Sequence, residues 1–231
     1  MHRFFFDDEI ADHVLIRGPQ AHQITKVLRL VPGQRITLVR EGGEAEVELL
    51  TLDGDAVHGR VVSRRRSENE LPFGVTLALP LLKGDHNEEV IEAVTQLGVR
   101  AIVPFISSRT VVRSLSTPKR ERWQRIARES AETARRGRFP TIEPLRDWEH
   151  VFDALGPGAL VAWEGETARS LHDAVRQTDL AIVIGPEGGL GSDEIAFARE
   201  RGGVTVSLGP RNLRSETAAI AAVAQAVAVL V

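Results

Sequence analysis

The chain has 231 residues, of which 42% are hydrophobic and 26% charged, the composition of a globular rather than a disordered protein. It contains no cysteine, which excludes disulfides and thiolate metal sites. Its first residues do not resemble a signal peptide, and no apolar stretch is convincing as a membrane span. We therefore expect a cytosolic protein.

Residues 1–70 are expected to form a small β-domain. Alternation of apolar and polar residues predicts strands at Arg35–Val39, Ala45–Leu49 and Ala56–Val62. The sequence Asp53-Gly54-Asp55 predicts a turn, and a short helix is expected at Ala21–Leu28. Five or six short strands with one helix suggest a small barrel. The polar run Ser63–Glu70 is expected to be the linker that follows it.

From Phe73 onward, predicted strands alternate with predicted helices, which indicates a mostly parallel sheet covered on both faces. Strands are expected at Val75–Pro80, Arg100–Ile106, Leu160–Trp163, Leu180–Ile184 and Val204–Leu208. Helices are expected at Asp85–Leu97, Pro118 to about Arg136, Leu171–Val175, Ser192–Arg201 and Ser215–Leu230. Asp85 and Glu88 have capping-box spacing. The last fourteen residues carry no charge, so we expect the final helix to be buried on nearly every side, in a core or an oligomer interface.

Charge is distributed unevenly along the chain. The net charge is −3, yet the segment Arg100–Arg146 holds twelve basic and four acidic residues and carries +8, which leaves −11 for the rest. A basic segment on an acidic body is expected where a polyanion docks on one face. The alternative is a solvated, arginine-rich helix face.

Two glycine-containing loops follow predicted strands directly. One is Ile184–Gly191, before a helix, and the other is Leu208–Arg214, before the last helix. In open α/β sheets, ligands bind outside the carboxyl ends of the strands, and glycine lets the backbone approach a ligand closely. The two loops therefore predict a small-molecule site, although each read alone could be a tight turn.

Several familiar motifs are missing. The sequence has no Walker A motif, no dinucleotide GxGxxG, no GxSxG elbow and no cysteine nucleophile. Its seven histidines are scattered and show no metal-ligand spacing, so no metal site is expected. The remaining class is a group-transfer enzyme that acts by positioning its two substrates. In such an enzyme the backbone would hold a small ligand, and arginines would hold a polyanionic partner.

A known family shares an ordered set of residues with nearly the whole chain. The shared residues are His22, Val27–Leu30, Gly33, Leu97–Val99, Ser108–Val111, Arg136–Pro140, Ile184–Leu190, Asp193–Ile195, Leu208–Arg211 and Leu213–Ala218. On these residues the chain resembles the RsmE-type 16S rRNA (uracil-N3)-methyltransferases of the SPOUT superfamily.

The resemblance implies an architecture and an activity. Residues 1–70 would form a PUA-like β-barrel that binds RNA, and residues 71–231 a SPOUT α/β domain with a C-terminal trefoil knot. The methyl donor would be S-adenosyl-L-methionine, and the acceptor N3 of a uridine in 16S rRNA of the small ribosomal subunit. The enzyme would be a homodimer.

The resemblance also implies site residues. The cofactor would contact Ala162, Trp163, Gly185, Pro186, Glu187, Gly188, Gly189, Leu208, Gly209, Pro210, Leu213 and Arg214. RNA would contact Lys26, Arg29, Arg109, Arg113, Arg135, Arg136 and Arg138.

Four residues are candidates for catalysis within this resemblance. Arg136 and Arg214 would stabilise negative charge on the uracil carbonyls, and Glu132 or Glu216 would orient an arginine or accept the proton. Glu216 could instead only stabilise its helix through the dipole, and Arg136 could only clamp a phosphate.

The chain departs from the family pattern at two places. At the first, Thr133 stands where the family usually has glutamine and Arg135 replaces a small residue. At the second, Ala93 and Gln96 stand where the family commonly has lysine and glutamate. These departures concern the handling of RNA and leave the cofactor loops intact. Three alternatives stay open: methylation of another base or a ribose 2′-oxygen, a non-catalytic RNA-binding assembly factor, and a binder of small nucleotides.

Overall fold

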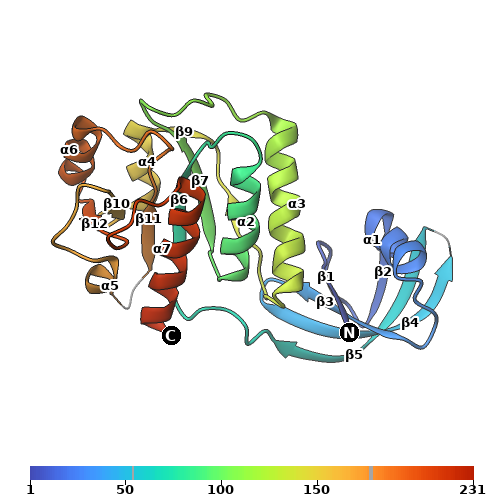
Figure 1. The fold of residues 1–231 in the computed structure, drawn as a ribbon. Helices are drawn as coiled ribbons and strands as arrows, with labels where there is room; N and C mark the ends of the chain where they lie inside the picture. Colours follow the sequence, from blue (N-terminus) through green and yellow to red (C-terminus); the bar gives the residue numbers. More distant parts are fainter. Residues whose placement is uncertain (54, 177–178) are drawn as a thin grey trace. The chain divides into compact units, whose positions relative to one another are not determined.

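The computed structural model describes residues 1–53, 55–176 and 179–231 (Figure 1). Gly54 of the predicted turn lies outside the described residues. The chain divides into two compact units, Met1–Glu70 with Ala131–Arg138, and Leu71–Ser130 with Phe139–Val231. The chain therefore crosses between the units three times.

The first unit is built on a five-stranded sheet in the order β1-β3-β4-β5-β2. Its strands are β1 (His2–Phe5), β2 (His13–Arg17), β3 (Arg35–Arg40), β4 (Gly43–Asp53) and β5 (Ala56–Arg66). Helix α1 (Gly18–His22) continues directly into the π-helical turn η1 (Gln23–Val27). The three predicted strands and the predicted helix are confirmed, although the helix begins earlier, because Pro19 favours its first turn.

The predicted linker Ser63–Glu70 is wrong in its first half, since Ser63–Arg66 complete β5. Polar cross-strand pairs hold these residues in the ladder. Arg65 Nε donates to Glu44 at 2.9 Å, and Ser63 Oγ donates to Glu46 at 3.2 Å. Such pairs between facing side chains stabilise a strand that alternation alone does not identify.

Residues Ala131–Arg138 pack in the first unit although they lie far along the chain. The Phe5 N–H donates to Glu132 Oε1 at 2.9 Å, and the Gly42 N–H donates to the Gly137 carbonyl at 3.0 Å. Periodicity carries no signal for such long-range contacts, so the sequence did not predict this grouping.

The second unit holds a sheet in the order β12-β10-β11-β6-β7-β8, with β9 also paired to β7. Its strands are β6 (Val75–Pro80), β7 (Ala101–Ile106), β8 (Thr141–Ile142), β9 (Arg146–Asp147), β10 (Leu160–Ala162), β11 (Leu180–Val183) and β12 (Val204–Val206). Each of these pairings is parallel. The near-continuous burial of β6 is typical of a central parallel strand.

Helices cover both faces of this sheet. They are α2 (His86–Gln96), α3 (Thr117–Thr133), α4 (Trp148–Leu155), α5 (Leu171–Ala174), α6 (Ser192–Glu200) and α7 (Ser215–Leu230). On one face, Leu77 of β6 belongs to a core with Trp123 of α3 and Ala222 of α7. On the other face, Ala78 belongs to a core with Phe152 of α4 and Ile195 of α6. The predicted α/β class, with a mostly parallel sheet and helices on both faces, is confirmed.

Three local predictions differ from the structure. Helix α3 ends at Thr133 rather than near Arg136, and Arg135 then adopts a left-handed φ of 57°, a common conformation beyond a helix end. The capping box at Asp85 does not form, because Glu88 pairs with Arg122 at 2.7 Å. Helix α4 was not predicted, although Trp148, Val151 and Phe152 have helical spacing and are buried.

The final helix, α7, has one fully buried face rather than burial on nearly every side. The residues of that face are Ser215, Ala219, Ala222, Val223 and Ala226. The helix packs against α2, α5 and β6. In the described part of the chain, no helix has the length and apolar character needed to cross a membrane.

Candidate functional site

Three strand ends of the second unit meet at one edge of its sheet. β10 lies between β11 and β12, and all three run parallel, so the loops that follow them are neighbours. The Trp163 N–H donates to the Val206 carbonyl at 3.1 Å. A Cβ added to Gly189 would lie 2.7 Å from Glu164 Oε1, which shows how closely the loops after β10 and β11 approach. The structure therefore brings together the two predicted loops, with Ala162 and Trp163 between them.

The loop after β11 makes a tight turn. The Gly189 N–H donates to the Pro186 carbonyl at 2.8 Å, and Gly189 has a φ of 70°, which a side chain rarely tolerates. Pro186 is buried, Gly185 and Gly189 are half-buried, and Glu187 and Gly188 are exposed. The turn therefore presents partly accessible backbone at the strand end, as a backbone-held ligand requires.

Two side-chain contacts hold the middle of this loop to the ends of β6 and β7. Glu187 Oε1 accepts a hydrogen bond from the Lys83 N–H at 3.0 Å. Arg109 Nη1 donates to the Gly188 carbonyl at 2.9 Å. Arg109, expected to contact RNA, is therefore also part of the loop's support.

Glu194 fastens the end of the same loop, and sequence reasoning assigned it no role. Its side chain is buried, and each oxygen accepts a backbone hydrogen bond at 2.8 Å, Oε1 from Ser108 and Oε2 from Gly191. The Gly191 bond is ordinary helix capping, but Ser108 lies on the loop after β7. Glu194 thus joins two loops, a contact that only the folded chain reveals.

The loop after β12 forms the other wall. Gly209 has a φ of 115°, and its N–H donates to Ser207 Oγ at 3.2 Å. Leu208 and Leu213 are half-buried, and Pro210 is exposed. Leu208 packs on the edge of the core. This wall therefore offers apolar side chains beside backbone groups.

Two of the predicted catalytic residues lie at the N-terminus of α7. Arg214 precedes the helix and is exposed, and its guanidinium bonds no other residue in the described ranges. Glu216 is half-buried within the first turn of α7. A cation and a carboxylate thus stand at the end of the loop after β12.

Glu166 orders the segment that follows β10. Its Oε2 accepts from Thr205 Oγ1 at 2.7 Å, and its Oε1 accepts the N–H groups of Ala168 and Arg169 at 2.9 and 3.2 Å. The Thr205 hydroxyl, followed by the backbone N–H groups, holds the pKa of Glu166 below its ordinary value. The carboxylate therefore ties this segment to β12.

The other two predicted catalytic residues, Arg136 and Glu132, belong to the first unit, whereas Arg214 and Glu216 belong to the second. The Arg136 side chain is 4% exposed, and its Nη2 lies 2.9 Å from Glu70 Oε2. Glu132 accepts the Phe5 N–H. This geometry favours structural roles for both residues.

The predicted RNA-binding residues are distributed over both units. Lys26, Arg29, Arg135 and Arg138 are exposed on the first unit, and Arg109 and Arg113 on the second. Arg113 Nη1 donates to the Ser107 carbonyl at 2.6 Å. Among the described residues, no three histidine, aspartate or glutamate side chains are grouped so that they could hold a metal ion.

The chain is similar to known RNA methyltransferases. The RNA methyltransferase domain family matches residues 69–227. The Ribosomal RNA small subunit methyltransferase E of Bacillus subtilis is 34% identical, over 94% of this chain and 93% of that protein. Its counterpart from Synechocystis is 36% identical, over 94% of this chain and 73% of that protein. The chain belongs to the ribosomal RNA small subunit methyltransferase E family, an RNA methyltransferase family.

Solved structures agree with this family. The methyltransferase E of Neisseria gonorrhoeae, bound to S-adenosyl methionine, has a TM-score of 0.88 and 29% identity, and 97% of this chain and 95% of that chain are covered. A Legionella pneumophila methyltransferase in complex with the same cofactor has a TM-score of 0.81 and 26% identity, with 96% and 94% covered.

Proposed function

We propose that this enzyme transfers the methyl group of S-adenosyl-L-methionine to N3 of a uridine in the 16S rRNA of the small ribosomal subunit, in the cytoplasm. The observation that carries the proposal is the meeting of three loops at the carboxyl ends of β10, β11 and β12, in a chain of this family. The RNA methyltransferase class follows from the family, and the donor and the acceptor atom are the proposal.

The residues at these strand ends fit the donor. The adenosine needs backbone groups and apolar contacts rather than a phosphate cradle, and the half-buried Gly185, Gly189, Leu208 and Leu213 supply both. Ala162 and Trp163, also half-buried, would form the third side. The remaining contacts would come from Pro186, Glu187, Gly188, Gly209, Pro210 and Arg214. Bound there, S-adenosyl-L-methionine supplies an electrophilic methyl group.

The chain itself must prepare the uracil. N3 is normally base-paired, so the base has to be unpaired or flipped out of its stack. Loss of the N3 proton spreads negative charge onto both carbonyl oxygens, and a guanidinium beside them lowers that cost. Arg214, exposed and uncommitted to any described residue, suits this role. Glu216 would orient it or accept the proton.

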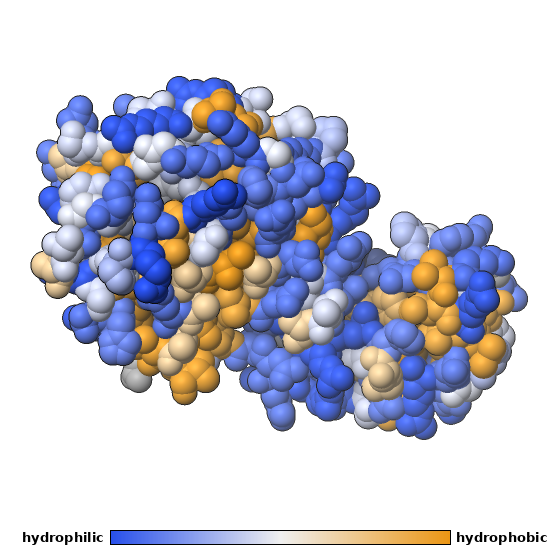
Figure 2. All heavy atoms as spheres, in the orientation of Figure 1, coloured by the Kyte–Doolittle hydropathy of each residue, from blue (hydrophilic) through white to orange (hydrophobic). Residues whose placement is uncertain are grey.

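We extend the proposal to the architecture. The first unit would act as a PUA-like barrel that binds RNA through Lys26, Arg29, Arg135 and Arg138. The trefoil knot would arise where α7 returns from the β12 edge to pack against α2 and β6. The homodimer would use apolar surface of the second unit, which Figure 2 shows in orange. Val229 of α7 and Val231, which follows it, are exposed and would contribute to that surface.

Methyl transfer to small ribosomal subunits that lack the modification tests the function directly. With labelled S-adenosyl-L-methionine, we expect one methyl group per subunit, which mass spectrometry of the digested 16S rRNA places on N3 of a uridine. A methyl group on a ribose 2′-oxygen or on another base would refute the assigned acceptor. Absence of transfer by a protein that binds the donor in calorimetry would indicate a non-catalytic RNA-binding factor.

Glu194→Ala tests the support of the donor site. Without the carboxylate, the Ser108 and Gly191 N–H groups lose their acceptor and the loops after β7 and β11 separate. Arg109 and Glu187 still hold the loop, so we expect the dissociation constant of S-adenosyl-L-methionine to rise about tenfold, a free energy comparable to one hydrogen bond to a charged group. Isothermal calorimetry measures it. Asp193→Ala, an exposed neighbour, is the matched control, and equal affinities of both variants would refute the role.

A further inference from the structure

Most cations of the basic segment Arg100–Arg146 are already bonded within the chain. Their acceptors are Asp179 for Arg100, the Gly188 carbonyl for Arg109, the Ser107 carbonyl for Arg113, the Gly84 carbonyl for Lys119, the Ile142 carbonyl for Arg120, Glu88 for Arg122 and Glu70 for Arg136. Three of these acceptors are carboxylates outside the segment and offset part of its +8, whereas the cations bonded to carbonyls keep their charge. Arg125 differs, since it is exposed and bonds to no described residue.

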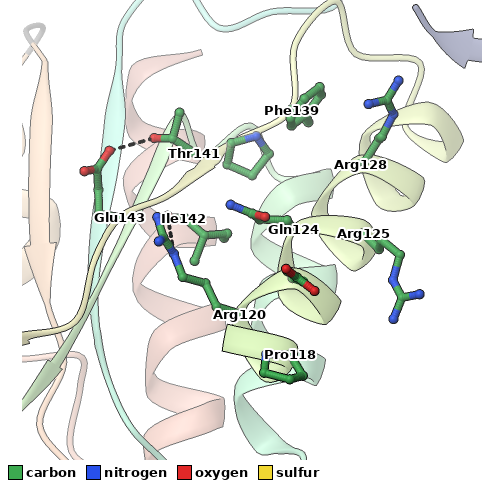
Figure 3. A pocket seen from close by; sticks show the side chains of 11 residues that line it. Pro118, Arg120, Gln124, Arg125, Arg128, Phe139, Thr141, Ile142 and Glu143 are labelled. Carbon is green, nitrogen blue, oxygen red and sulfur yellow. Dashed lines mark hydrogen bonds between the residues drawn. The ribbon is translucent and has the colours of Figure 1, made fainter. Parts of the chain in front are cut away.

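Arg125 lies at a hollow of about 830 Å³ between α3 and the segment 139–143, here called the α3 hollow. Its lining residues include Arg120, Gln124, Arg125, Arg128 and Phe139. In Figure 3, Gln124 and Arg120 point from α3 toward the segment, and Arg125 extends from the outer side of the helix. The volume falls within the range of small-molecule sites, about 300–1,000 Å³.

One end of the α3 hollow has the chemistry of a base-stacking platform. The Phe139 side chain is 38% exposed, and the Arg128 guanidinium lies over its ring, 5.5 Å from the centroid. An aromatic ring and an arginine plane stack on any nucleobase. Arg120 Nη2 donates to the Ile142 carbonyl at 2.8 Å, which ties α3 to the segment 139–143.

The charges of the hollow orient a nucleotide. Glu121 and Glu143 are both among the residues that line the hollow, so a phosphate close to either one would be repelled. The Gln124 amide offers both a donor and an acceptor to a base edge. Arg125, at the outer side, offers a cation to a phosphate. Base inward and phosphate outward is the arrangement that these groups favour.

We propose that the α3 hollow binds an unpaired nucleotide of the rRNA substrate, its base stacked on Phe139 and its phosphate paired with Arg125. This nucleotide is not the one that is methylated. β8 and the donor-site strands lie at opposite ends of the sheet, and the three strand spacings between β8 and β11 amount to about 14 Å. The proposal rests on the proposed function, since it requires an RNA substrate.

Binding of a fluorescent, unstructured RNA of eight nucleotides tests the proposal by fluorescence anisotropy. Phe139→Ala should raise the dissociation constant about tenfold at fixed salt. Phe139→Leu should raise the dissociation constant by the same factor, because leucine keeps the apolar bulk but lacks the flat ring. Neither variant should change the slope of log Kd against log salt concentration, whereas Arg125→Ala should lower that slope by about 0.7, one phosphate contact to a single strand.

Arg122→Ala is the matched control. It removes one positive charge from the same helix, but Arg122 does not line the hollow and pairs with Glu88. Its affinity should stay within about twofold of wild type, the size of a weak surface contribution. Wild-type affinity of Phe139→Leu, equal losses in Arg122→Ala and Arg125→Ala, or no binding by the unmodified enzyme would overturn the proposal.

Two further measurements on the same variants separate this inference from the proposed function. The calorimetric affinity for S-adenosyl-L-methionine should be unchanged in all of them. If the enzyme methylates small subunits but the variants do not show the predicted changes in oligonucleotide binding, the inference is overturned and the proposed function stands. The predicted pattern without any methyl transfer would support the hollow and refute the function.

Discussion

Arg214→Ala is expected to lower kcat about 100-fold or more, the loss seen when one donor to a developing oxyanion is removed. Arg214 is exposed at the start of α7, and its guanidinium is not bonded to any described residue. It can therefore meet the uracil carbonyl that gains charge when N3 loses its proton. Single-turnover methylation of small subunits measures the effect.

The affinity for S-adenosyl-L-methionine separates catalysis from binding. If Arg214 stabilises the transition state, kcat should fall far more than the affinity for the donor, which loses only one of many contacts. Arg214→Lys should recover only part of the rate, because an ammonium cannot present the planar fork of a guanidinium. Arg211→Ala, an exposed arginine of the same loop, is the control. Equal losses of rate and donor affinity in Arg214→Ala would show that Arg214 only binds.

Arg136→Ala is expected to lower the free energy of unfolding by about 2 kcal/mol, because it removes a hydrogen-bonded ion pair between a buried guanidinium and the half-buried Glu70. The Arg136 guanidinium is held by Glu70, and its carbonyl accepts from Arg3 Nη2 at 2.7 Å. Glu70 also accepts the N–H groups of Gly137 and Arg138. The pair therefore anchors the segment Ala131–Arg138 in the first unit. Urea denaturation measures the loss.

The neighbouring Arg135 provides the control for this prediction. Arg135 is exposed, and Arg135→Ala keeps its Cβ and its backbone conformation, so its stability should change by less than about 0.5 kcal/mol. The kcat per folded molecule of Arg136→Ala should stay near that of the wild type. A variant with full stability and no activity would return Arg136 to the catalytic group.

Local patterns predicted the elements where short-range forces decide them. Val75–Pro80 reads as a buried strand because a central parallel strand is apolar on both faces, and it is one. The polar residues of Ser63–Arg66 predict a linker, yet hydrogen bonds to Glu44 and Glu46 hold this segment in β5. Propensity describes a residue in isolation, whereas a ladder adds partners from elsewhere in the chain.

The candidate site also has parts that local sequence predicts and parts that it does not. Its loops were recognisable because glycine and proline next to an apolar strand impose a turn, and parallel strands place their carboxyl ends at one edge. Glu194 was not recognisable as a brace, because its acceptor role toward Ser108 depends on two loops that are distant in sequence.

The α/β class, the two loops and the excess of arginine between residues 100 and 146 can be read from the sequence. Which of those arginines face a carboxylate depends on the folded chain. Arg122, Arg125 and Arg136 are chemically identical, but one pairs with Glu88, one is exposed, and one is buried against Glu70. A carboxylate close to an arginine offsets much of the charge that the arginine presents to a partner, and the fold sets which arginines have one.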